Sequence, residues 1–530
     1  MRQLEHDFVE LLGGQLAGFE HPSELEAELF VPALRGEHTH DEQAPARDVE
    51  PGPGPDLGEE LLDECVAVDV TLGEERELAV DLADHLLAEF PAAGLLAECP
   101  AAGRFPVRTA GGVGGFVVAH GRARYSRVAQ STTVRIVAEL VYNPYSFDFH
   151  DDPYTRYRRL REEAPAYWNS DLEFWALTRF DDVHEGFRDF ATLSSANGVA
   201  LENRGMVAKG FRQMIEIDPP EHTVFRKLVS RVFTGRRVTE MEDQIRTIVS
   251  GYLDGIVAKG EADLVGEVTG PFPMDVICSV LGVPEGDRAE LRSYADTLLV
   301  RADGKPEMPP EAMEGMMRLA GYFDADLRRR DPDEDPGLIS ELLPLEVDGR
   351  SLTHEELLGF CILFVIAGHE TTTKMVANGI ELLERHPAQR QTIVDDPTLV
   401  PGAIEEVLRF HNSTQYMHRT VTRDVERHGE TLRKGDSVLL VIGAANHDDR
   451  EFGPTSEAFD ITRRPERHLA FGYGAHFCLG AALARMEGKV AMEEIHRRIP
   501  DYVVDRDRAT RFHSGNVTGW TSLPVTFTPS

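Results

Sequence analysis

The sequence predicts a protein built mainly from α-helices, with a few small β-sheets. Two observations predict this fold class: long stretches have the apolar spacing of amphipathic helices, and runs with β-propensity are short and bounded by turn-forming residues. No repeat with a period of about 20 to 50 residues is visible, which excludes a solenoid. The 530 residues exceed the roughly 250 to 300 at which one core stops growing, so we expect one very large domain or a domain with an appendage.

The helical and strand patterns begin at about residue 134. The first helix should end before Pro165, because the residue that precedes a proline is disfavoured in helical conformation. The longest helical pattern is strongly apolar and contains no proline. We expect helices at 154–164, 238–257, 311–330, 354–384, 402–410 and 479–498, and strands at 175–178 and 437–442.

Composition indicates a folded, water-soluble protein. Hydrophobic residues make up 42% and charged residues 28%, and the net charge is −36. Such a negative charge excludes general nucleic-acid binding, which needs a basic face. The most apolar stretch, 357–368, is shorter than the roughly 20 residues that span a bilayer, so we expect no membrane anchor. The five cysteines are scattered and odd in number, which favours a reducing, cytoplasmic location.

The first 133 residues differ from the rest of the chain. They hold 25 acidic residues against 9 arginines and no lysine, a net charge of −16, and include loop-like runs at 51–55 and 111–115. Short amphipathic helices are expected at 4–19 and 74–90. Three interpretations stay open for residues 1–133: a disordered acidic extension, a small helical module, or upstream sequence read from too early a start codon. Residues 134–530 form the predicted main domain.

Cys478 is the most informative of the cysteines. It follows a glycine-rich loop and precedes a helix rich in Ala and Leu. A helix N-terminus lowers the pKa of a nearby thiol through its dipole and its unpaired N–H groups, which makes the thiolate a good metal ligand. Gly472, Gly474 and Gly480 permit tight turns and close approach of a flat molecule. Spacing alone leaves haem ligation and a buried structural cysteine open, whereas His476 and Cys478 supply only two of four zinc ligands.

The long central helix carries an unusual group of residues near its middle. Ala367 and Gly368 are small where bulk is expected, which indicates that another molecule approaches the backbone there. Glu370 and Thr371 place an acid beside a hydroxyl, a pair that can order a water and deliver protons. The alternative is a Thr371 that bonds back to the carbonyl four residues earlier and a Glu370 that is solvated at the surface.

Four segments together resemble the cytochrome P-450 family, and the resemblance covers about residues 142–528. The cysteine loop is similar to the haem-binding signature of that family, and the other three match its further motifs in the same order along the chain. The matching residues are Phe471, Gly474, His476, Cys478 and Gly480; Glu406 and Arg409 of a Glu-x-x-Arg helix; the oxygen-activating segment 367–372; and the haem-clamping segment 218–226.

The resemblance implies a cytochrome P-450 fold of soluble bacterial, actinobacterial type, in which haem b lies between the long central helix and the cysteine loop. It implies that Cys478 is the axial thiolate ligand, that Thr371 and Glu370 relay protons, and that His369 packs the helix. Further cofactor-binding residues by resemblance are Phe471, Gly474, Gly480, Ala367 and Gly368, with the propionate partners His222, Arg226, Arg419 and His476.

The sequence departs from the family pattern at two places. The Glu406–Arg409 pair is expected to be buried and structural, but the position of its usual third partner, an arginine, is held here by Ala458. Arg463 and Arg464 are the candidate substitutes. The second departure is the polar segment 412–415, where many family members carry a proline pair. It lies near the expected substrate and weakens any assignment of that substrate by analogy.

The activity implied is insertion of one oxygen atom of O2 into a small hydrophobic substrate, by hydroxylation or epoxidation. Electrons would come from NAD(P)H through an external ferredoxin reductase and ferredoxin, because the chain carries no reductase motif. Steroids, terpenoids, fatty acids and polyketides all fit the expected apolar pocket. A peroxide-driven peroxygenase and a non-enzymatic haem-thiolate sensor are the alternatives. The basic residues Arg463, Arg464, Arg467 and His468 are either a ferredoxin-docking patch or ordinary solvated charges.

Overall fold

The computed structural model describes residues 65–71, 113–119, 140–205 and 213–530. The chain divides into two compact units, Met1–Leu140 and Val141–Ser530. The helices predicted at 4–19 and 74–90 lie outside the described residues.

In the first unit, the described residues form one antiparallel strand pair. Strand β1 (Cys65–Thr71) pairs with β2 (Val113–Ala119) in a register that places Cys65 opposite Ala119 and Thr71 opposite Val113. The sequence predicted a loop over 111–115, and that prediction is wrong from Val113 onward. Glycine weakens a strand but does not forbid one, and the β-prone residues that follow, Phe116 to Val118, extend the pairing.

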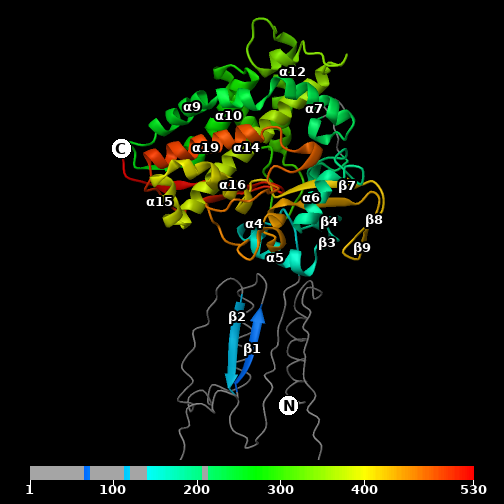
Figure 1. Ribbon diagram of the computed structural model, residues 1–530, viewed down its shortest axis with the longest axis vertical. Helices are drawn as coiled ribbons and strands as arrows, with labels where there is room; N and C mark the ends of the chain where they lie inside the picture. The colour runs from blue at the N-terminus through cyan, green and yellow to red at the C-terminus, as the bar shows by residue number, and fades with distance from the viewer. Residues whose placement is uncertain (1–64, 72–112, 120–139, 206–212) are drawn as a thin grey trace, which may run out of the picture. The chain divides into compact units, whose positions relative to one another are not determined.

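The second unit consists mainly of helices with small sheets, as the sequence predicted. Helices gather at one end and the largest sheet lies at the other (Figure 1). The helices are α4 (Phe147–Asp151), α5 (Pro153–Glu163), α6 (Phe180–Arg188), α7 (Glu221–Val232), α8 (Gly235–Glu240), α9 (Glu242–Asp254), α10 (Pro271–Leu281), α11 (Arg288–Ala295), α12 (Pro310–Arg329), α13 (Leu338–Leu342), α14 (His354–Arg385), α15 (Pro387–Asp395), α16 (Val400–Phe410), α17 (Ile442–Ala445), α18 (Asp449–Phe452) and α19 (Ala481–Arg498).

Most of the predicted helices begin and end within a few residues of the observed ones, and two differences have a physical reason. The predicted helix 238–257 is interrupted at Met241, because Glu242 and Asp243 start a new helix whose N-terminal dipole favours acidic residues. Helix α10 was not predicted from the sequence, because it is buried on nearly all sides and so lacks an amphipathic pattern. Gly282, which ends α10, has a φ of 84°, the left-handed conformation of a helix cap.

Helix α14 passes through the centre of this unit and contacts α10, α12, α16 and α19 (Figure 1). It begins with a capping box, in which the Glu356 N–H donates to Thr353 Oγ1 (3.2 Å) and the Thr353 N–H donates to Glu356 Oε2 (2.8 Å). By length and hydropathy α14 could cross a membrane, but 72% of its most apolar window is buried inside the protein. It is therefore the core helix that the sequence predicted.

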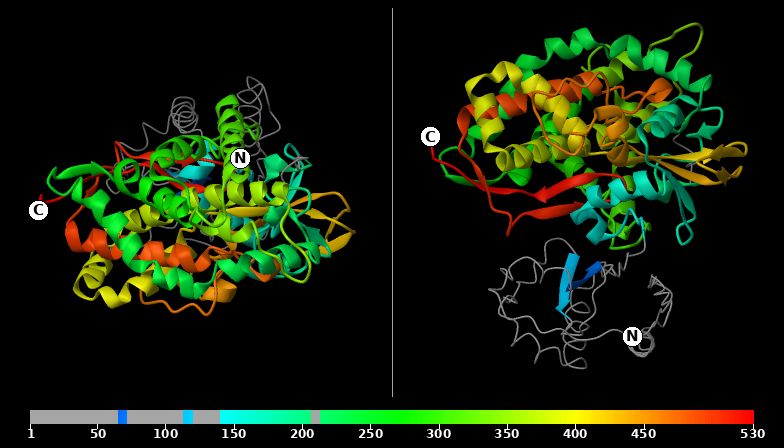
Figure 2. Two further views of the ribbon diagram at one scale, coloured as in Figure 1. Left: turned by 90° about the horizontal axis from the view of Figure 1, so that it is seen from above. Right: turned by 60° about the horizontal axis from the view of Figure 1, so that its bottom comes forward.

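The sheets surround this helical core. A five-stranded sheet has the order β3-β4-β10-β7-β5, with β4 and β10 parallel and the other pairs antiparallel. The C-terminal strands, in red in Figure 2, lie along one side, where two of them form a hairpin and two others form a three-stranded sheet with β6. The strands are β3 (Ala166–Asn169), β4 (Phe174–Leu177), β5 (Leu193–Ser194), β6 (Glu261–Asp263), β7 (Tyr416–Val421), β8 (Val425–Arg427), β9 (Glu430–Leu432), β10 (Ser437–Val441), β11 (Val503–Val504), β12 (Thr510–His513), β13 (Thr518–Ser522) and β14 (Pro524–Thr526).

We predict that Ile380→Ala destabilises the protein by about 2 to 5 kcal/mol, because Ile380 is fully buried on α14 and its removal leaves a cavity in the core. Urea unfolding followed by circular dichroism measures the change. The control is Met317→Ala on α12, where the side chain is 68% exposed and the expected change is within about 0.5 kcal/mol. Equal losses in the two variants would contradict the assignment of α14 as the core helix.

Candidate functional site

The cysteine loop connects the segment after α18 to the N-terminus of α19. Gly472 and Gly474 have φ values of 65° and 71°, a conformation that favours glycine, and a Cβ on Gly474 would lie 2.9 Å from the carbonyl oxygen of Phe187. The Cys478 N–H donates to the Phe471 carbonyl (2.9 Å), which closes the loop. These contacts present Cys478 one turn before α19 begins.

Cys478 is half-buried, and its sulfur lies beside the backbone N–H groups at the start of α19. Burial raises the pKa of the Cys478 thiol, whereas the backbone N–H groups of Gly480 and Ala481 and the charges of Arg226 and Arg485 lower it. The same N–H groups and cations would stabilise a thiolate. The thiolate-favouring features predicted from the loop's position are therefore present, but burial outweighs them and the pKa of the Cys478 thiol is raised overall.

Four basic side chains from three separate segments gather beside this loop. His222 and Arg226 come from α7, Arg419 from β7 and His476 from the loop itself. The rings of His222 and His476 are 4.1 Å apart between centroids, and Arg226 Nη1 donates to the Ala475 carbonyl at 3.4 Å. The structure thus brings together all four residues that the sequence analysis assigned to the propionates.

The electrostatics of this cluster favour a bound anion. Burial, followed for the histidines by repulsion from neighbouring cations, lowers the pKa of His222 to about 4 and of His476 to about 3. Burial also lowers the pKa of Arg419 to about 10. Within 140–205 and 213–530, no carboxylate lies within ion-pair distance of Arg226 or Arg419, and His222 Nδ1 is buried without a hydrogen-bond partner. A bound anion would stabilise the two arginines and raise the pKa of both histidines.

Two serines that sequence reasoning missed support the cluster. Ser195 Oγ lies 3.2 Å from His476 Nε2 and donates to Asp218 Oδ1 (2.9 Å), and Ser194 Oγ donates to the other oxygen of the same carboxylate. Asp218 is therefore already engaged by hydroxyl groups. No sequence signal links residues 195 and 476, which are far apart in the chain and meet only in the fold.

The middle of α14 has an open face in an otherwise buried helix. Ala367 is exposed, and Leu363 and Thr371, one turn before and after it, are only half-buried. The need for a glycine at position 368 has a different cause from the predicted approach of another molecule: a Cβ there would overlap the side chain of Ile277 on α10. Its small size permits close packing of two helices, while Ala367 faces the opening.

The structure agrees with the alternative to proton delivery, a back-bonded Thr371 and a solvated Glu370, for Thr371 but not for Glu370. The Thr371 hydroxyl donates to the Ala367 carbonyl (2.6 Å), as that alternative stated. Glu370 is only 5% exposed, so it is not a solvated surface residue. Its Oε2 lies 3.0 Å from Lys374 Nζ and its Oε1 lies 4.0 Å from His369 Nε2.

These contacts connect Glu370 to the protein surface. His369 is buried and its Nε2 lies 2.8 Å from Asp296 Oδ1, whose side chain is 44% exposed. Lys374 is also buried, with its ammonium 4.1 Å from the centre of the Phe512 ring. Lys374 was not among the residues predicted for the site, although its position four residues after Glu370 is the spacing of a helical ion pair.

Glu487 is a further acid that the sequence did not reveal. It lies on α19, fully buried, and burial raises the pKa of its carboxyl well above the usual range. The Thr372 hydroxyl donates to its Oε2 at 3.5 Å, while Oε1 has no hydrogen-bond partner in the described part of the chain. Glu487 therefore links α14 to the helix that follows the cysteine loop.

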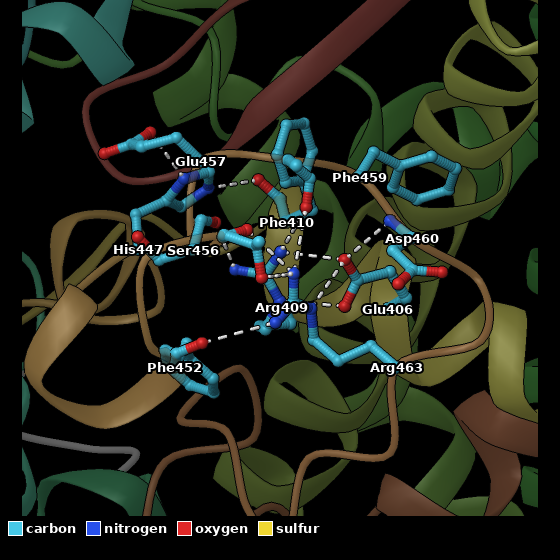
Figure 3. Close-up of polar contacts among 12 residues, drawn as sticks. Glu406, Arg409, Phe410, His447, Phe452, Ser456, Glu457, Phe459, Asp460 and Arg463 are labelled. Carbon is cyan, nitrogen blue, oxygen red and sulfur yellow. Dashed lines mark hydrogen bonds and ion pairs between the residues drawn. The ribbon is translucent and has the colours of Figure 1, made fainter.

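The Glu406–Arg409 pair is fully buried on α16, with two parallel hydrogen bonds of 2.8 Å each (Figure 3). Arg409 also donates to the Asn446, Ser456 and Ala458 carbonyls. Ala458, which stands where the family pattern has an arginine, therefore still contributes its backbone carbonyl to Arg409. Arg463 takes the role of the third partner, with its Nε 3.3 Å from Glu406 Oε1. Of the two candidate substitutes, the structure thus identifies Arg463.

Comparisons with known proteins agree on one family. The family model described as cytochrome P-450 matches residues 323–498. Cytochrome P-450 123 of Mycobacterium tuberculosis is 43% identical over 400 residues, which cover 74% of this chain and 98% of the relative. The vitamin D(3) 25-hydroxylase of Pseudonocardia autotrophica is 37% identical over 393 residues, which cover 73% and 96%.

Solved structures give the same result. CYP109Q5 from Chondromyces apiculatus matches with a TM-score of 0.67 and 31% identity, covering 73% of this chain and 98% of that one. A fold of helices with small sheets and a glycine-rich cysteine loop beside a basic cluster defines a haem-thiolate enzyme. The chain belongs to the cytochrome P-450 family. It is accordingly an oxidoreductase of the monooxygenase class, and members of this family bind haem b through a cysteine thiolate.

We predict that Arg409→Met destabilises the protein by about 3 to 5 kcal/mol, because it leaves the buried Glu406 carboxylate without its main partner. Thermal unfolding and the yield of haem-loaded protein measure the effect. Arg463→Met removes a longer contact at the edge of the same cluster and should cost clearly less. An Arg409 variant as stable as the parent would show that the pair does not hold the fold.

Proposed function

We propose that this monooxygenase inserts one oxygen atom of O2 into a small hydrophobic molecule, with Cys478 as the ligand of its haem iron. The observation that carries the proposal is the cysteine loop at the start of α19, next to four basic groups, none of which has a carboxylate within ion-pair distance in the described part of the chain. The two propionates of haem b would supply anions to this cluster, and Cys478 would supply the thiolate.

The residues fit haem b in three respects. Arg226, Arg419, His222 and His476 would hold the propionates through charge-assisted hydrogen bonds. The open face of α14 at Ala367 and the half-exposed loop 471–480 are where a flat macrocycle would contact the chain. When bound, the thiolate-ligated haem supplies the oxygen-activating chemistry, since a cysteine thiolate donates electron density that favours O–O cleavage.

The protein's own contribution to the reaction is proton delivery. The Thr371 hydroxyl lies on the open face of α14 and would orient a water there. Glu370 is held by Lys374 and lies within 4.0 Å of His369, which contacts the half-exposed Asp296. Glu370 would take protons from this side and pass them toward Thr371. A peroxygenase would not need such a pair, so its presence favours the O2-dependent reaction.

We infer that the electrons come from NAD(P)H through a separate ferredoxin reductase and ferredoxin. The Gly472–Gly474 pair is used in the cysteine loop and is not a nucleotide-binding loop. The basic patch considered in the sequence analysis is a poor candidate for docking, because Arg463, Arg467 and His468 pair with Glu406, Glu451 and Glu405. Docking would therefore use other basic side chains around the cysteine loop.

For the substrate, we propose a steroid-like or similarly rigid hydrophobic molecule as the first class to test. One relative is named vitamin D(3) 25-hydroxylase, and CYP109E1 from Bacillus megaterium has been solved in complex with testosterone at 31% identity and a TM-score of 0.63. Titration of a steroid panel, read as a shift of the haem Soret band, tests this class. Shifts with fatty acids or macrolides and none with steroids would contradict it.

Cys478→His should remove the red-shifted Soret band that a thiolate gives the reduced, carbon-monoxide-bound protein, because imidazole is a weaker electron donor than thiolate. An absorption spectrum measures this directly. Cys361→Ser, at a fully buried cysteine on α14, is the control and should keep the band wherever it loads haem. Persistence of the band in the Cys478 variant would refute the ligand assignment.

Thr371→Ala should leave haem loading intact but lower product formation about tenfold or more, because a proton-delivering group is lost. Electrons would then leave as hydrogen peroxide, so the ratio of peroxide to NAD(P)H consumed is the measurement. Thr373→Ala is the matched control, since its hydroxyl makes the same kind of back-bond, to the His369 carbonyl (3.0 Å), away from the open face. Normal coupling in the Thr371 variant would remove that residue from the relay.

A further inference from the structure

The polar segment between α16 and β7 lies against the middle of α14. Ser413 is 5% exposed, and its hydroxyl donates to the main-chain carbonyl of Thr371 at 2.7 Å. The Ser413 carbonyl accepts from the Thr518 N–H at 2.8 Å, which ties the same residue to β13. A side chain from a distant segment thus contacts the residue whose hydroxyl is proposed to relay protons.

This contact leaves Thr371 bound at both of its polar ends. Its hydroxyl donates to the Ala367 carbonyl at 2.6 Å, and its carbonyl accepts from Ser413. A helical carbonyl ordinarily accepts only from the N–H four residues later, but its second lone pair is free to take another donor. The Ser413 hydroxyl therefore binds this turn of α14 from outside the helix, at the main-chain carbonyl of Thr371.

A second tie holds the segment in place independently of Ser413. Asn378 is fully buried on α14, and its Nδ2 donates to the His411 carbonyl (3.3 Å) and the Thr518 carbonyl (3.4 Å). Residues 371 and 378 are seven apart and lie on one stripe of the helix. Since Asn378 keeps the segment docked, loss of the Ser413 hydroxyl should affect the Thr371 turn without releasing the whole segment.

We propose that Ser413 is a positioning residue, which fixes the turn of α14 that carries Thr371 and thereby the direction of the Thr371 hydroxyl. It acts through Thr371 and takes no proton itself. The functional half of this inference rests on the proposed role of Thr371 as a proton relay. The contact itself and its effect on the helix stand apart from that role and are measured separately.

Hydrogen exchange on the full-length, haem-loaded protein tests the structural half. In Ser413→Ala, peptides covering residues 368–376 should exchange about 2- to 10-fold faster, the effect of losing one net hydrogen bond on local opening. Ser413→Thr keeps the hydroxyl and should restore slow exchange. Thr392→Ala removes the same kind of bond on α15, from Thr392 Oγ1 to the Ala388 carbonyl (2.9 Å), and should change nothing on α14. Unchanged exchange in Ser413→Ala would overturn the proposal; if that variant fails to load haem, Ser413→Cys takes its place.

The fraction of electrons released as peroxide tests the functional half. Ser413→Ala should raise that fraction at least twofold but less than Thr371→Ala, Ser413→Thr should return it to the parent value, and the double variant should match Thr371→Ala alone. Faster exchange with an unchanged peroxide fraction would make Ser413 merely structural and overturn its positioning role. If Thr371→Ala itself kept normal coupling, the proposed relay would fail, and the exchange result would still decide whether Ser413 holds the turn.

Discussion

The arrangement of the site depends on a carboxylate and a guanidinium that share no contact with water. Glu406 and Arg409 are both fully buried, and such a pair is tolerated only when every remaining hydrogen-bonding group is satisfied. Arg409 meets this condition by donating to three backbone carbonyls, including that of Asn446. The Asn446 side chain in turn accepts from the Leu469 N–H (2.8 Å), and the Leu469 carbonyl accepts from the Gly472 N–H (2.8 Å). A continuous chain of hydrogen bonds therefore leads from the buried pair to the cysteine loop.

A second constraint is the contrast between the charge of the whole chain and the charge of the site. The chain carries a net charge of −36, yet the cluster of His222, Arg226, Arg419 and His476 has no carboxylate of its own within ion-pair distance among the described residues. Burial, and to a smaller extent the neighbouring cations, lowers the pKa of both histidines, so these rings bind a proton less readily than a free histidine does. Anions bound at this cluster would stabilise its cationic groups, so haem binding and the stability of the folded protein are coupled.

How far the sequence predicts this molecule depends on how local each signal is. The cysteine loop, the Glu370–Thr371 pair and the ends of α14 are encoded within a few residues, and the sequence identified them. Lys374 was also within reach, because a Glu–Lys spacing of four is a local signal. The Ser195–His476 and Ser413–Thr371 contacts join segments far apart in the chain, so that only the fold reveals them. The choice of Arg463 over Arg464 likewise depends on the path of the backbone after Ala458.

The structure also explains why the reaction class is easier to derive than the substrate. The groups proposed to serve the reaction are polar, and each is placed by specific hydrogen bonds, such as those on either side of Thr371. The hydrogen-bond partners of these groups can therefore be identified individually in the structure. A hydrophobic substrate is held instead by apolar surface, which is non-directional and tolerates many shapes. The polar residues at 412–415 are the exception. The Ser413 hydroxyl already donates to α14, and the Gln415 side-chain amide donates to the Asn412 carbonyl within the segment, so both groups have partners inside the protein.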